Sequence, residues 1–182
     1  MYTPLEQPAF LVALGMSSIA AITDLRTGLI PNTVVGLGAL TGVLAQLSEV
    51  ALGQVGISAA LQQMGLGLAL GALMPATLYA LGALGGGDLK LFAAIGLCLG
   101  PSRVIAIELW SHVIALMFVP LHWLANGTLL TSLGTSARLV HNVFAPASAR
   151  KPIDRTSLTT LRLAPSILFA VVWVCLLGAR LP

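Results

Sequence analysis

Two aspartates stand beside apolar stretches of the chain and could do chemistry. Asp88 follows three glycines in Leu84-Gly-Gly-Gly-Asp-Leu-Lys90, and Asp24 opens the polar segment Asp24-Leu-Arg-Thr-Gly-Leu-Ile-Pro-Asn32. A charged carboxylate beside hydrocarbon costs ~2.5 to 3.5 kcal/mol on membrane-insertion scales, so both placements call for a reason. Two carboxylates that share one proton can hydrolyse an amide, because the ionised one activates water and the protonated one polarises the carbonyl. The pair therefore predicts an aspartyl protease site.

Three glycines precede Asp88, namely Gly85, Gly86 and Gly87. Without Cβ atoms they allow positive φ and leave room for an extended substrate backbone beside the carboxylate. Two structural alternatives remain open. The glycines could simply turn the chain between two helices, with Asp88 as an N-cap. Asp24 could be an interfacial charge paired with Arg26.

The composition places these aspartates in a membrane protein. Of the 182 residues, 57% are hydrophobic and only 8% are charged, against roughly 25% charged in an average soluble domain. At roughly 20 apolar residues per crossing, this length holds several helices but no sizeable soluble domain. We therefore expect an all-α polytopic membrane protein, with residues 1–182 forming a single membrane-embedded peptidase domain. The net charge of +3 is small and its bases sit mostly in loops, which indicates membrane topology and no nucleic-acid partner.

A bundle of about six transmembrane helices accounts for the apolar runs. The expected helices cover residues 8–23, 32–50, 57–84, 88–100, 102–125 and 161–181, and residues 126–160 form a polar cytoplasmic loop. Pro31 forces the residue before it out of helical geometry, and Asn32 or Thr33 is a good N-cap for the second helix.

The expected fourth helix is too short to cross the membrane unaided. Its roughly thirteen residues reach about 20 Å at ~1.5 Å per residue, whereas the hydrocarbon core is ~30 Å thick. We expect the glycine turn before it to dip below the membrane surface, because irregular backbone is allowed there when it lines a wet cavity. Close helix packing is expected at two glycine pairs with GxxxG spacing, Gly38 with Gly42 and Gly67 with Gly71.

The distribution of basic residues predicts the topology. The loops after the first, third and fifth helices and their flanks carry Arg26, Lys90, Arg138, Arg150, Lys151, Arg155 and Arg162. The opposite side has only Arg103 and Arg180, so the positive-inside rule makes the first set cytoplasmic. This assignment puts the N-terminus outside and both aspartates at the cytoplasmic face. The bases of the long loop are expected to anchor lipid headgroups.

Two further pairs of residues have simpler interpretations. Glu108 and His112 are four positions apart and share a helix face. We weigh a structural hydrogen-bonded pair against a role in tuning the aspartate site. Cys98 and Cys175 lie in apolar runs without a second pair, so we expect them to pack as small hydrophobic side chains and expect no metal site.

With both aspartate segments in view, the sequence resembles the type IV prepilin peptidases, membrane aspartyl proteases with the GxGD signature. Gly85-Gly-Gly-Asp-Leu-Lys-Leu91 is similar to the second aspartate motif, and Gly96 extends it. Asp24-x-Arg26 with Ile30-Pro31-Asn32 is similar to the first. Leu163-Ala-Pro-Ser-Ile-Leu168 looks like a weakened form of the family's Pro-containing segment. The presenilin and signal-peptide-peptidase group also uses GxGD, but no Tyr precedes Asp24 and no Pro-Ala-Leu segment is present in the last helix.

The resemblance implies an aspartic-type endopeptidase that removes the leader of type IV prepilin-like (Flp or pseudopilin) precursors at the cytoplasmic face of the bacterial inner membrane. The residues it implies are catalytic Asp24 and Asp88, with Gly85, Gly86, Gly87, Lys90, Arg26, Pro31 and Asn32 supporting the substrate. It implies two partners, a precursor with a hydrophobic N-terminal helix and membrane lipid, in pilus biogenesis or protein secretion, and no cofactor. The chain resembles the short form without the N-terminal extension and paired cysteines of bifunctional members, so methyltransferase activity is not part of the expectation.

Two other classes of protein remain open. In an ion- or proton-coupled transporter, Asp24, Asp88 and Glu108 would carry ions. Such sites tend to lie near the membrane midplane, whereas both aspartates map to one end of the bundle. A purely structural subunit of a secretion assembly would need neither aspartate.

Overall fold

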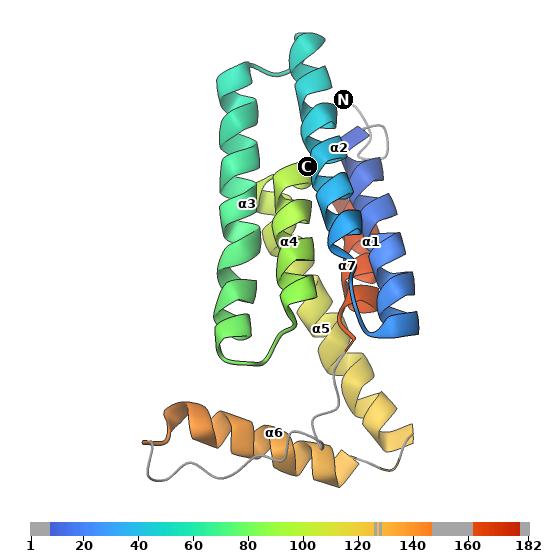
Figure 1. The fold of residues 1–182 in the computed structure, drawn as a ribbon, viewed down its shortest axis with the longest axis vertical. Helices are drawn as coiled ribbons and strands as arrows, with labels where there is room; N and C mark the ends of the chain where they lie inside the picture. The colour runs from blue at the N-terminus through green and yellow to red at the C-terminus, as the bar shows by residue number, and fades with distance from the viewer. Residues whose placement is uncertain (1–7, 126, 128, 147–161, 179–182) are drawn as a thin grey trace. The chain divides into compact units, whose positions relative to one another are not determined.

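The computed structural model describes residues 8–125, 127, 129–146 and 162–178. The chain divides into two compact units, one formed by Met1–Ile114 with Arg162–Pro182 and the other by Ala115–Leu161. Every regular element in the described ranges is an α-helix (Figure 1). The predicted all-α fold class is therefore confirmed.

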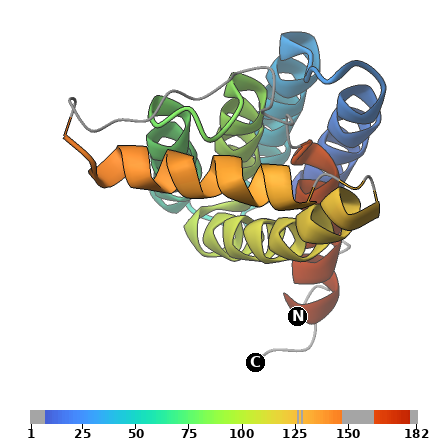
Figure 2. The same ribbon diagram turned by 90° about the horizontal axis from the view of Figure 1, so that it is seen from below.

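The first unit is a bundle in which a short helix contacts three longer ones. Its helices are α1 (Pro8–Thr27), α2 (Asn32–Ala51), α3 (Ile57–Ala80), α4 (Gly86–Leu99), the beginning of α5 (Pro101–Ala125) and α7 (Ala164–Gly178). The short helix α4 packs against α1, α2 and α3, and α7 packs against α1 (Figures 1 and 2). The side chains of Leu91, Phe92 and Ile95 on α4 are fully buried. This burial holds α4 in place although it has only 14 residues.

Glycines let these helices approach to backbone contact. A Cβ atom added to Gly67 of α3 would lie 2.0 Å from the carbonyl oxygen of Gly96 on α4, and one added to Gly96 would lie 2.1 Å from the carbonyl oxygen of Gly67. On α2, a Cβ at Gly42 would lie 2.1 Å from Sγ of Cys98. The predicted close packing at the glycine pairs is confirmed, and Cys98 packs as a buried side chain.

Among the described residues, four helical stretches are long and apolar enough to cross a membrane: α1, α2, α3 and residues Pro101–Phe118 of α5. Beside them, α4 is shorter, and α7 offers an apolar stretch at Ala164–Val174. Large apolar side chains such as Leu37, Leu40 and Leu44 are exposed on α2, which suits a lipid environment. The chain is therefore an all-α polytopic membrane protein.

The second unit contains the end of α5 and a helix, α6 (Leu129–Phe144), where the sequence analysis expected a polar loop. That part of the loop prediction is wrong, because apolar residues recur there at helical spacing among Thr, Ser and Arg. Residues 147–161, with the bases Arg150, Lys151 and Arg155, lie outside the described residues.

Several predicted helix ends also need correction, among them that of α3, which ends at Ala80 and not at residue 84. The first helix continues to Thr27, so Asp24 lies inside α1 rather than after it. Pro31 occupies the N-cap position of α2 in extended geometry, without a side-chain cap, so the capping role of Asn32 or Thr33 is wrong. The fixed φ of proline, −64° here, suits the entry to a helix. Because α4 begins at Gly86, Asp88 sits in its first turn rather than at its N-cap.

Candidate active site

Asp24 lies in the last turn of α1 and is 6% exposed. The amide of Gly28 donates to the carbonyl of Asp24 at 2.8 Å, and the positive φ of Gly28, 70°, ends the helix there. The Asp24 carboxylate interacts electrostatically with the backbone amide of Ala164, the first residue of α7, and with the guanidinium of Arg162 just before that helix. Arg162 also donates a hydrogen bond to the carbonyl of Leu25, which ties this segment to the end of α1.

Asp88 lies in the first turn of α4 and is 9% exposed. Its carboxylate turns back towards the backbone amide of Gly85. A Cβ atom on Gly85 would lie 3.2 Å from Oδ2 of Asp88, which is tighter than ordinary packing allows. A glycine at position 85 therefore keeps space for this carboxylate.

Packing of α1 against α4 brings the two aspartates together from distant parts of the sequence. They are close enough for the charge of Asp24 to act on Asp88. The Oδ2 atom of Asp24 is buried and has no hydrogen-bond partner among the described residues. Two carboxylates so placed can share one proton and divide the roles of acid and base. Asp24 is near the end of α1 and Asp88 near the beginning of α4, and these two helix ends lie at the same end of the bundle, the lower end in Figure 1.

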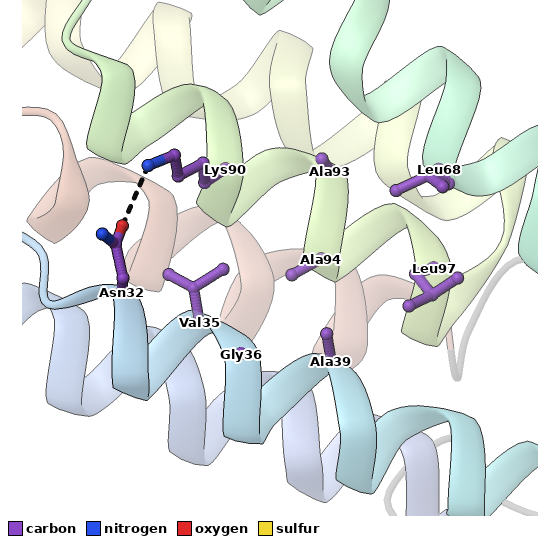
Figure 3. Close-up of a pocket in the computed structure, with 9 residues that line it drawn as sticks. All are labelled: Asn32, Val35, Gly36, Ala39, Leu68, Lys90, Ala93, Ala94 and Leu97. Carbon is purple, nitrogen blue, oxygen red and sulfur yellow. Dashed lines mark hydrogen bonds between the residues drawn. The ribbon is translucent and has the colours of Figure 1, made fainter.

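The turns beside the aspartates also meet. The Nζ atom of Lys90 donates a hydrogen bond to Oδ1 of Asn32 at 2.9 Å (Figure 3). A Cβ atom on Gly87 would lie 3.1 Å from Cβ of Ile30. The residues between α1 and α2, with the first residue of α2, are thus in direct contact with the beginning of α4, so the two motifs recognised separately in the sequence meet.

The glycines before Asp88 act through their lack of a side chain and not through unusual backbone angles. None of Gly85, Gly86 and Gly87 has a positive φ, so that part of the sequence expectation is wrong. The positive φ in this turn belongs to Gly82, at 73°. A Cβ on Gly86 would meet the Tyr79 ring at an ordinary 3.5 Å, so packing within the protein does not require a glycine there.

Arg26 does not pair with Asp24 in the part of the chain that is described; its side chain is exposed. The cation that acts on Asp24 is instead Arg162. From the sequence, Arg162 is expected only as one of the basic residues that flank the helices. The feature of the sequence that could have pointed to Arg162 is its position next to the segment Leu163-Ala-Pro-Ser-Ile-Leu168, whose first residues reach the site.

Glu108 and His112 do not form the side-chain pair that the sequence suggested. The Nδ1 atom of His112 lies 2.7 Å from the backbone carbonyl oxygen of Glu108, while its ring stacks on Phe92 at 6.0 Å. Oε1 of Glu108 and Nε2 of His112 are buried without a partner among the described residues. Within the same residues, no three His, Cys, Asp or Glu side chains gather as a metal site.

Comparison with known proteins adds a family assignment. A family model described as the type IV leader peptidase family matches residues 11–120. This range contains both aspartates and both of the segments that meet around them. No curated protein and no solved structure gives a match.

Proposed function

The chain belongs to the type IV leader peptidase family, and we propose that it is an aspartyl endopeptidase with Asp24 and Asp88 as its catalytic pair. Membership of a peptidase family favours this activity over the ion transporter that the intramembrane acids also suggested. The observation that supports the pair most strongly is that packing of α1 against α4 brings two buried aspartates within electrostatic range of each other, although 63 residues separate them in the sequence.

The mechanism follows from two carboxylates that hold one proton. The ionised carboxylate takes a proton from a water molecule as that water attacks the scissile carbonyl. The protonated carboxylate donates its proton to the carbonyl oxygen, giving a neutral tetrahedral intermediate. Proton transfer to the leaving amine then breaks the C–N bond. Burial of both aspartates strengthens these interactions, because little water screens them.

The substrate we propose is a type IV prepilin-like precursor, such as an Flp pilin or a pseudopilin, whose leader is removed at the cytoplasmic face of the bacterial inner membrane. Arg26, Lys90 and Arg162 lie at the aspartate end of the described bundle, and Arg103 lies at the start of α5. The positive-inside rule then supports a cytoplasmic site and an external N-terminus.

A cleavage assay tests this function. Detergent-purified protein is incubated with a prepilin-like precursor, and mass spectrometry follows loss of the leader. We expect cleavage by the unaltered chain and none by Asp24→Asn or Asp88→Asn, because an amide cannot serve as the acid or the base. The proposal fails if the unaltered chain cleaves nothing or if either variant cleaves at the normal rate.

A further inference from the structure

A groove of about 380 Å³ opens on the bundle between α2 and α4 (Figure 3). Small side chains form much of its walls, among them Gly36 and Ala39 on α2 and Ala93 on α4. The polar members of its lining are Asn32 and Lys90, which the figure shows joined by a hydrogen bond at one end of the groove. The groove therefore starts at the aspartate end of the bundle and is apolar beyond it.

The direction of the groove follows from its two walls. Both α2 and α4 begin at the aspartate end, as the contact between Asn32 and Lys90 requires. From Asn32 to Ala39 the wall runs about 10 Å along α2, since each helical residue rises ~1.5 Å. The groove thus extends about two helical turns away from the aspartate end, along a helix long enough to span the membrane.

The chemistry of the walls selects the kind of occupant. At membrane depth a polypeptide exposed to lipid must be helical, because its backbone groups find no water. Small residues on a helix surface allow a further helix to come close. A volume of about 380 Å³ is near the lower end of the ~300–1,000 Å³ typical of ligand pockets, so it suits side chains from one face of a helix rather than a whole helix.

We propose that this groove binds the apolar helix of the protein substrate and holds it while the adjoining scissile segment reaches Asp88. This inference rests on the proposed function, because it names where that function's substrate is held. It adds Gly36, Ala39 and Ala93, which lie outside the aspartate motifs, as residues that determine which substrates bind.

The path from groove to carboxylate gives the glycines a role. Asp88 and Lys90 are two positions apart, about 200° around α4, so they lie on nearly opposite sides of its first turn. A helix is ~10 Å across with its side chains, so the way around half of it is about 16 Å, which about five extended residues cover. The substrate segment would pass the beginning of α4 beside Gly86, the glycine of the three whose Cβ position keeps an ordinary 3.5 Å from its nearest neighbour, the Tyr79 ring. Since packing within the protein does not require a glycine at position 86, room for the substrate segment is the role that we assign to it.

A larger side chain in place of Gly36 would fill the groove without disturbing the packing of the bundle. It is exposed, and a Cβ atom added to it would meet nothing within 4 Å, so Gly36→Leu is compatible with the packing of the bundle. Leucine also favours a helix more than glycine does. Gly15 on α1 is equally exposed and open, and it does not line the groove. Gly15→Leu is therefore the matched control.

The test compares two substrates in the same detergent, a precursor with its apolar helix and a short peptide that spans the scissile bond without that helix. We expect Gly36→Leu to lower the ratio of kcat/KM for precursor to kcat/KM for peptide by at least about tenfold, the loss of roughly one buried apolar side chain. Gly15→Leu should leave the ratio unchanged. An unchanged ratio in Gly36→Leu overturns the inference.

A photo-crosslinker at position 93, in the Asp88→Asn background that leaves precursor uncut, gives an independent measurement. Crosslinks to the apolar helix of the precursor support the inference, and crosslinks to lipid alone or to a second copy of the chain overturn it. The proposed function fails separately, when the unaltered chain does not cleave or when the asparagine variants do.

Discussion

Asp24 and Asp88 are costly residues to bury, and one backbone amide of the bundle faces each carboxylate. Burying a charge is unfavourable unless it is paired or hydrogen-bonded. The backbone amide of Ala164 faces Asp24, and that of Gly85 faces Asp88. Oδ2 of Asp24 keeps no partner among the described residues. An oxygen in that position is available to a water molecule or to a substrate, as catalysis requires.

Gly85→Ala tests how sensitive the rate of cleavage is to the position of the Asp88 carboxylate. The new methyl group would lie 3.2 Å from Oδ2 of Asp88, so the carboxylate must shift by a few tenths of an ångström. We expect kcat to fall about tenfold, because small misplacements of catalytic groups are expensive, while the melting temperature stays close to that of the unaltered protein. Gly15→Ala is the control for a mutation in open space. Normal kcat in Gly85→Ala would contradict the geometry described for Asp88.

Among the elements, the pair α3 and α4 sets the position of Asp88. Their backbones touch at Gly67 and Gly96, and the side chains of Phe92 and Ile95 on α4 are fully buried. A 14-residue helix has little stability of its own, so tertiary packing must supply most of it. Changes at the helix contact should therefore act on the whole bundle.

Gly67→Ala should destabilise the bundle. Its Cβ would lie 2.0 Å from a backbone oxygen of α4, which cannot move as a side chain end can. We expect a loss of roughly 1 to 3 kcal/mol or more, typical of overpacking, seen as a lower melting temperature in detergent. Gly65→Ala, on the same helix with nothing within 4 Å, should keep or slightly raise that temperature. Equal melting temperatures for the two variants would refute the contact.

At the scale of the whole molecule, the topology can be measured directly. We expect Leu29→Cys, between α1 and α2, to react with a membrane-impermeant maleimide only in inverted membrane vesicles. We expect Gln54→Cys, between α2 and α3, to react in intact cells with a permeable outer membrane. The chain without either substitution measures background labelling, to which the buried Cys98 should contribute little. The opposite labelling pattern would place the aspartates outside.

Much of the architecture could be predicted because membrane helices are long apolar runs, and these are visible in one sequence. The two aspartate segments could be recognised for a similar reason, since each is polar and rich in Gly or Pro between such runs. The role of α7 could not be foreseen in the same way. Arg162 and Ala164 reach Asp24 only because α7 packs against α1, and apolar helix faces look alike in sequence.

The two remaining errors, at α6 and at the glycines before Asp88, arise where a local sequence signal allows more than one structure. The many polar residues of α6 favour a loop in the sequence, although the apolar residues among them recur at helical spacing. Positive φ was expected at Gly85–Gly87 because glycine allows it. Those glycines are needed instead for the space they leave, at Oδ2 of Asp88 and at Ile30, which depends on neighbours that a sequence does not show.

Asp24 and Asp88 should act as one catalytic unit, and the rate of leader release by three variants shows whether they do. Asp24→Asn, Asp88→Asn and the double variant are compared under single-turnover conditions with the same precursor. Residues that act as a unit lose nearly everything when either is changed. We predict that both single variants fall to the same residual rate and that the double variant is no slower. A double variant whose loss equals the product of two partial losses would contradict the claim.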